Sequence, residues 1–60
     1  MTYIVSDYQW SPGHRWERFE WTATAAEIRS EFDVDPERVA TLILRLPFDM
    51  GERILVWKPS

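Results

Sequence analysis

The chain has 60 residues, of which 45% are hydrophobic and 15% aromatic, and its formal net charge is −3 at pH 7. This length predicts one compact domain, residues 1–60, with a single thin core. The lack of cysteine excludes disulfides and thiolate metal sites, and the lack of a basic stripe gives no support to direct nucleic-acid binding.

The first element is a predicted β-hairpin over residues 3–21. Residues 3–10 are rich in β-branched and aromatic types and predict a strand. Ser11-Pro12-Gly13-His14 predicts a type II turn, since proline fixes φ at the second position and glycine accepts a positive φ at the third. Residues 15–21 predict the returning strand. In the first strand, alternation places Tyr3 and Val5 on one face and Ile4, Tyr8 and Trp10 on the other.

A helix is predicted over residues 24–32. Thr24 and Glu27 have the three-residue spacing of a capping box, in which each side chain bonds to the other residue's backbone N–H. Ala25, Ile28 and Phe32 recur at helical spacing, so we expect them to face the core.

The stretch after the helix is compatible with two structures. Asp35-Pro36 is typical of a helix start, whereas Thr41-Leu-Ile-Leu-Arg-Leu46 alternates as a strand does. Because a glycine-containing loop and the apolar run 53–57 follow, we favour one helical turn at 36–38 and a strand at 39–46. The predicted order is then β-β-α-β-β, an α+β fold with a four-stranded antiparallel sheet and one helix packed on one face.

No catalytic, cofactor or metal motif is recognisable, so we expect a protein that is not an enzyme and needs no cofactor. The single histidine, His14, falls in the first turn, where an exposed turn residue is expected. Asp33, Asp35 and Glu37 alternate as a calcium loop begins, but Arg38 stands at the glycine position of such a loop. Its closing bidentate glutamate is missing too, since Leu44 occupies that position.

Two groups of side chains predict protein binding. The first is acidic: residues 27–37 carry a net charge of −4, which a partner protein with a basic surface would compensate. The second is aromatic and flanks the first turn, where one helix cannot cover every ring, and exposed aromatic rings commonly anchor interfaces. The candidate residues are Glu27, Glu31, Asp33, Asp35, Glu37, Tyr8, Trp10 and Trp16.

In size, acidity and lack of motifs the chain resembles small phage-encoded inhibitors of the anti-CRISPR type. That resemblance implies a stoichiometric inhibitor of a nucleic-acid-binding host or defence complex. The alternative is a domain that self-associates through the uncovered sheet face, and we expect a monomer or a weak homodimer. The first residues lack the basic start of a signal peptide, and no apolar run reaches the length of a membrane span, so a cytoplasmic protein is expected.

Overall fold

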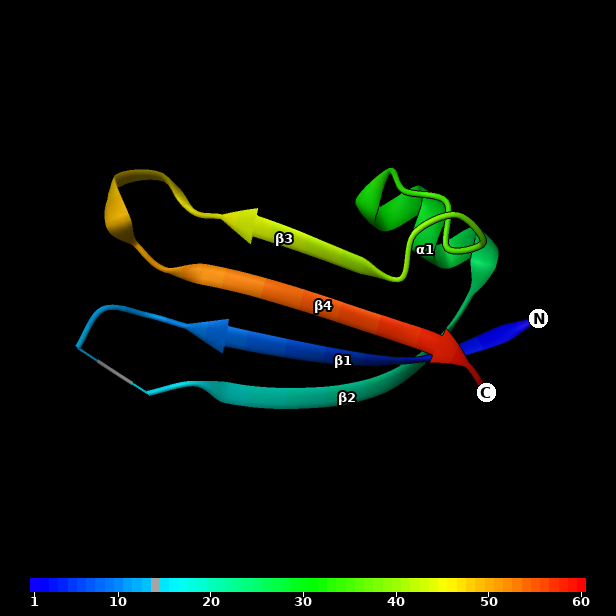
Figure 1. Ribbon diagram of the computed structural model, residues 1–60, viewed down its shortest axis with the longest axis horizontal. Coiled ribbons are helices and arrows are strands. Elements are labelled where there is room, and N and C mark those ends of the chain that lie inside the picture. Colours follow the sequence, from blue (N-terminus) through cyan, green and yellow to red (C-terminus); the bar gives the residue numbers. More distant parts are fainter. Residues whose placement is uncertain (14) are drawn as a thin grey trace.

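The computed structural model describes residues 1–13 and 15–60 (Figure 1). In this part of the chain, four strands and one α-helix follow in the order β-β-α-β-β, so the predicted α+β fold is confirmed. The expectation for His14 lies outside the described residues. The elements are β1 (Thr2–Trp10), β2 (Glu17–Thr24), α1 (Ala25–Phe32), β3 (Thr41–Arg45) and β4 (Glu52–Pro59), with a short 3-10 helix, η1 (Pro47–Asp49), before β4.

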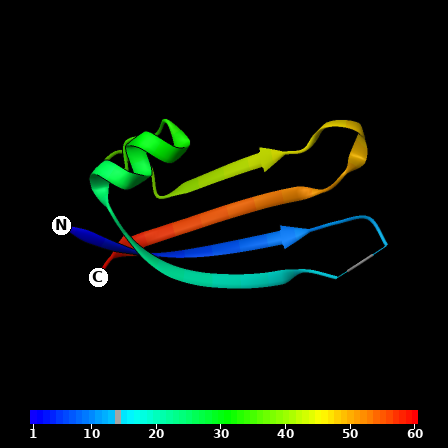
Figure 2. The ribbon, with the colours of Figure 1, turned by 180° about the vertical axis from the view of Figure 1, so that it is seen from behind.

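The strands form one antiparallel sheet in the order β2-β1-β4-β3. Two hairpins, β1–β2 and β3–β4, are therefore joined by pairing of the first and last strands, with Val5 opposite Trp57. The segment that contains α1 connects the edge strand β2 to the opposite edge strand β3. Both ribbon views place this helix at the end of the sheet where the chain termini lie, with both hairpin loops at the other end (Figures 1 and 2).

The core lies between α1 and one face of the sheet. Alternation along β1 and β4 directs Tyr3, Val5, Leu55 and Trp57 to this covered face, where each is buried. Ile28 is the buried residue of α1 and joins the same cluster, as the helical spacing predicts. The indole Nε1 of Trp57 donates to the carbonyl of Val39 at 2.8 Å, which satisfies the polar end of this buried ring.

The predicted capping box is present at the start of α1. The Glu27 N–H donates to the Thr24 hydroxyl at 3.1 Å, and the Thr24 N–H donates to the Glu27 carboxylate at 2.9 Å. The helix ends at Asp33, whose φ of 55° is left-handed and whose N–H donates to the carbonyl of Arg29 at 2.9 Å. Local sequence therefore sets both ends of the helix.

Two predicted strands begin too early and the last one is too short. The second strand begins at Glu17, so Arg15 and Trp16 precede it, and it continues to Thr24, beyond the predicted end at residue 21. β4 extends beyond 53–57 at both ends. The third strand is limited to Thr41–Arg45, because the N–H groups of Arg38 and Val39 both donate to the Asp35 carbonyl in the single turn that precedes it. That turn occupies the predicted positions 36–38.

Glycines shape the two hairpin loops. Gly13 has a φ of +82°, the sign that the third position of a type II turn requires. At Gly51, where φ is +128°, an added Cβ would lie 2.0 Å from the carbonyl oxygen of Trp10. The β3–β4 loop thus passes against the end of β1, and only glycine fits there.

Candidate functional site

The structure places the three predicted aromatic residues on one sheet face and packs two of them, Trp10 and Trp16, against each other. Tyr8 and Trp10 lie on the face of β1 opposite the core and are half-buried, and the rings of Trp10 and Trp16 have centroids 6.4 Å apart. The guanidinium carbon of Arg18 lies 5.9 Å from the centroid of the Tyr8 ring. This arrangement forms an aromatic group near the first turn, on the sheet face that the helix leaves open.

The aromatic group continues into an apolar row across the sheet. The register places Tyr8 opposite Ile54, and Ile54 opposite Ile43, so three neighbouring strands contribute one side chain each. Val56 lies on the same face of β4, two residues beyond Ile54. The exposed fractions of Ile43 and Val56 are 55% and 39%, which is high for aliphatic side chains in a sheet.

The acidic segment contains more internal contacts than its sequence suggests. Asp35 accepts hydrogen bonds from the Glu37 N–H at 3.0 Å and from the Arg29 guanidinium at 3.4 Å. Its other carboxylate oxygen lies 3.8 Å from Nε of Arg38. With Arg29 and Arg38 included, residues 27–38 carry five carboxylates and two arginines, a net charge of −3. The structure therefore places Asp35 inside a small ion-pair network.

The other four acidic candidates are exposed. Glu27 caps the helix, and its pKa is lowered by the hydrogen bond from the Thr24 backbone N–H and by its contact with the Thr24 side chain. Glu37 reaches Arg29 only at 3.9 Å. Glu31 contributes to raising the pKa of Arg53, an effect dominated by the hydrogen bond from Arg53 to Asp7. Negative charge is thus available on the helix and at its exit, mainly at Glu31, Asp33 and Glu37.

The acidic and aromatic groups do not form one surface. The acidic residues belong to α1 and its exit loop, at the end of the molecule where the termini lie (Figure 1). Tyr8, Trp10 and Trp16 lie close to the first turn and on the opposite sheet face. Because the two groups lie at opposite ends of the molecule and on opposite sides of the sheet, a flat partner surface can cover one group but not both.

A buried ion pair was not predicted from the sequence. Asp7 follows Tyr3 and Val5 on the covered face of β1 and is 1% exposed. Its carboxylate accepts from Nε of Arg53 at 3.0 Å, from Nη2 of Arg53 at 2.6 Å and from the Gln9 amide at 3.0 Å. Phe32 of the helix packs over the guanidinium, with 5.7 Å between its ring centroid and the guanidinium carbon. The signal available in the sequence is the position of Asp7, two residues after Val5.

The pKa of Asp7 results from opposing effects. Burial disfavours the charged carboxylate and by itself raises the pKa, while the hydrogen bonds from Arg53 and Gln9 and the positive charge of Arg53 lower it. The balance keeps the pKa below its ordinary value. Asp7 is therefore a charged structural residue at neutral pH, and every buried side-chain polar atom in the described part of the molecule has a hydrogen-bond partner.

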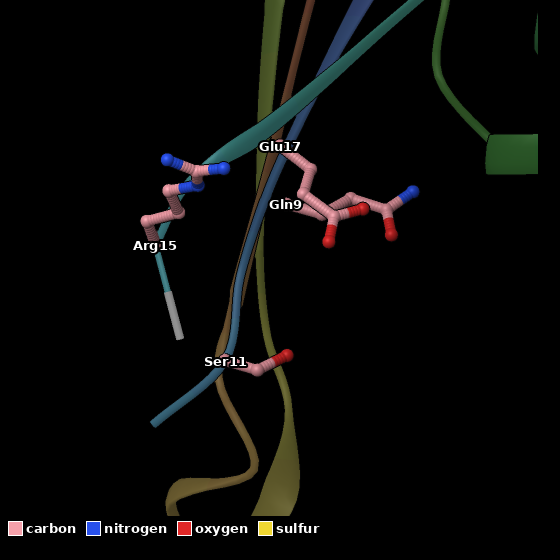
Figure 3. Close-up of a pocket in the computed structure, with 4 residues that line it drawn as sticks. All are labelled: Gln9, Ser11, Arg15 and Glu17. Atoms are coloured by element: carbon pink, nitrogen blue, oxygen red, sulfur yellow. The ribbon is translucent and has the colours of Figure 1, made fainter. Parts of the chain in front are cut away.

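A surface hollow of about 230 Å³ near the first turn does not bring its polar side chains together around one point. It is lined by Gln9, Ser11, Arg15 and Glu17. In Figure 3 the Arg15 side chain lies on the opposite side of the ribbon from those of Gln9 and Glu17. Among the residues described, no three His, Cys, Asp or Glu side chains are grouped so as to hold a metal ion. Within residues 1–13 and 15–60, no helix combines the length and the apolar character needed to cross a membrane.

No protein-family model, curated protein or solved structure matches the chain significantly. The surfaces described above therefore provide the basis for assigning a function.

Proposed function

We propose that this chain is a small acidic protein-binding module that inhibits a nucleic-acid-binding host or defence complex stoichiometrically, in the cytoplasm. It covers a basic surface of that complex and performs no chemistry of its own. The observation that carries the proposal is the uneven distribution of charge over the folded molecule. Residues 27–38 carry −3, while the open sheet face, with Arg18, Arg45 and Lys58 against Glu20 and Glu52, carries +1.

The contacting carboxylates are those that the fold uses least. Asp35 is held by its own loop and by two arginines, and Glu27 caps the helix, so both are assigned mainly structural roles. Glu31, Asp33 and Glu37 are exposed on α1 and its exit loop, and Glu37 approaches Arg29 only to 3.9 Å. These three side chains are proposed to meet the lysines and arginines of the partner.

Such a contact affects the rate of association with the partner more than the rate of dissociation. Exposed charges steer the encounter and raise the association rate, and salt screens them over about 8 Å at physiological ionic strength. Binding that rests on this acidic surface is therefore expected to weaken steeply with added salt. A partner surface that otherwise holds nucleic acid also predicts competition, because phosphates and these carboxylates would occupy the same basic side chains.

The experiment compares charge reversals at two places on the molecule. Tagged wild-type protein, the Glu31→Lys variant and a Glu17→Lys control capture partners from a host lysate. The control makes the same change in net charge, at an exposed position of β2 that does not lie on the open sheet face. We expect a partner that binds wild type and control but binds the acidic-surface variant at least about tenfold more weakly, which corresponds to about 1.4 kcal/mol. Duplex DNA or RNA should release it.

A captured partner that binds both variants equally would contradict the assignment of this surface. Equal weakening by both variants would mean that total charge, rather than the acidic surface of α1, determines the interaction. Circular dichroism of the free proteins verifies that each variant retains the fold.

A further inference from the structure

We propose that the open face of the sheet is a homodimer interface, on which two copies of this chain pack face to face. The centre of this face is apolar, where a solvated antiparallel sheet is normally polar. The row of Tyr8, Ile54 and Ile43 crosses three strands, and Val56 lies beside it on β4. Trp10, with Trp16 packed against it, extends the apolar area toward the first turn.

Charged residues on this face lie around the apolar row. Arg18 and Glu20, on the edge strand β2, form an ion pair at 2.8 Å. Arg45 and Glu52 approach to 3.7 Å beside the β3–β4 loop. Because these pairs neutralise each other within one copy, two such faces meet with little repulsion. An apolar centre inside a polar rim is the usual organisation of a protein interface.

The size of the face fits a second copy. The four strands contain 30 residues, and at about 3.3 Å per residue along a strand and about 4.8 Å between strands they cover about 475 Å² for each copy, or about 950 Å² in total. This area lies near the lower limit of about 1,000 Å² for a specific interface, which fits a dimer that dissociates in the micromolar range. The end of the molecule that carries the exposed Phe48 measures only 19 × 14 Å, about 270 Å² for each copy, which is too small.

Charge also decides which face a second copy can cover. The helix side carries the −3 of residues 27–38, so two such sides repel each other, whereas the open face carries only +1. A 60-residue chain with one covered face has a small core, and packing two sheets about 10 Å apart buries apolar area that the monomer cannot. The expected dissociation constant is micromolar, since Tyr8, Trp10 and Ile54 are already partly buried in the monomer.

If the proposed function also holds, the dimer has a consequence for it. Both acidic surfaces point outward, so one dimer presents two copies of the partner-binding surface and gains avidity toward a complex with repeated basic sites. The two proposals use opposite sides of the molecule and can fail separately.

The test is sedimentation equilibrium of the full chain from about 1 μM to about 500 μM, a range that brackets a micromolar dissociation constant. We expect the mass to rise from the monomer value of 7.2 kDa toward twice that value. Ile43→Lys should keep the protein monomeric throughout, because a lysine in the apolar row cannot be paired across the interface. Val39→Lys is the control, since Val39 is similarly exposed but lies outside the sheet.

A second variant keeps the test independent of folding. Thr41 is exposed on the same face, so Thr41→Lys adds a charge to the interface without removing an apolar side chain. A wild-type chain that stays monomeric at 500 μM overturns the proposal. So does a dimer that Ile43→Lys and Thr41→Lys leave intact, or one that Phe48→Ser abolishes instead, since the latter would locate association at the loop end.

Discussion

The two faces of the sheet are built from the same strands and have opposite surroundings. On β4, Leu55 is completely buried under α1, while the next residue, Val56, is 39% exposed on the open face. Both are aliphatic, so composition does not distinguish them. The difference arises because the single helix covers one face only. We infer that the covered face determines the stability of the monomer, whereas the apolar residues of the open face are the ones available for the proposed association.

A truncation in the covered face should destabilise the protein most. Leu55→Ala removes a side chain with 0% exposure and should lower the free energy of unfolding by about 3 kcal/mol. For a domain of this size, that lowers Tm by about 12–24 °C. Ile54→Ala, on the open face of the same strand, should cost less than about 1 kcal/mol in the monomer. Urea titrations followed by circular dichroism at low micromolar concentration measure both.

Equal losses of stability for Leu55→Ala and Ile54→Ala would contradict the difference between the two faces. That result would mean that the open face contributes to the stability of the monomer as much as the core does. At high protein concentration, Ile54→Ala should lose more stability than at low concentration, because it also loses the stabilisation that dimerisation provides.

The second prediction concerns the ion pair of Asp7 and Arg53 on the covered face. Asp7→Asn keeps an acceptor of similar shape but removes the negative charge that compensates Arg53. We expect the free energy of unfolding to fall by about 2 kcal/mol. This is less than the cost of breaking a completely buried pair, because the guanidinium is already about one third exposed and can turn toward water. Ser6→Ala, the neighbouring position on the open face, is the control and should change stability by less than about 0.5 kcal/mol.

Acid should reduce the difference in the free energy of unfolding between wild type and Asp7→Asn. The folded-state pKa of Asp7 lies below its ordinary value of 3.8, so the unfolded chain binds this proton more readily than the folded chain does. The stabilisation from Asp7 is therefore complete well above pH 3.8 and is lost as the pH falls through the folded-state pKa. Urea midpoints of both proteins between about pH 6 and pH 2 measure this, and a constant difference would contradict the role given to the ion pair.

Local patterns were sufficient to predict most of the fold but not the site. The capping box of Thr24 and Glu27 and the alternation along β1 depend on neighbouring residues, and both predictions are confirmed. The pairing of Asp7 with Arg53 joins residues 46 positions apart, and it follows from the register of β1 against β4, which no local pattern specifies. Because the sheet order was not predicted either, the opposite locations of the acidic and aromatic groups could not be deduced.

Two carboxylates on the helix side, one paired with arginines and one exposed, should differ only slightly in their contribution to stability. Asp35→Asn weakens contacts with Arg29 and Arg38 and should cost about 0.5–1 kcal/mol, the usual range for a partly exposed ion-pair network. Glu31→Gln removes an exposed charge whose interaction with Arg53 is purely electrostatic. The free energy of unfolding should therefore change by no more than about 0.5 kcal/mol.

Partner binding should follow the opposite order. An exposed carboxylate without internal hydrogen bonds is free to pair with a partner's lysine or arginine, whereas Asp35 would first have to leave its own arginines. Glu31→Gln should therefore weaken the captured complex more than Asp35→Asn, although it perturbs the monomer less. If the order of binding losses instead matched the order of stability losses, the acidic segment would be a structural feature of the helix exit rather than a surface that a partner covers.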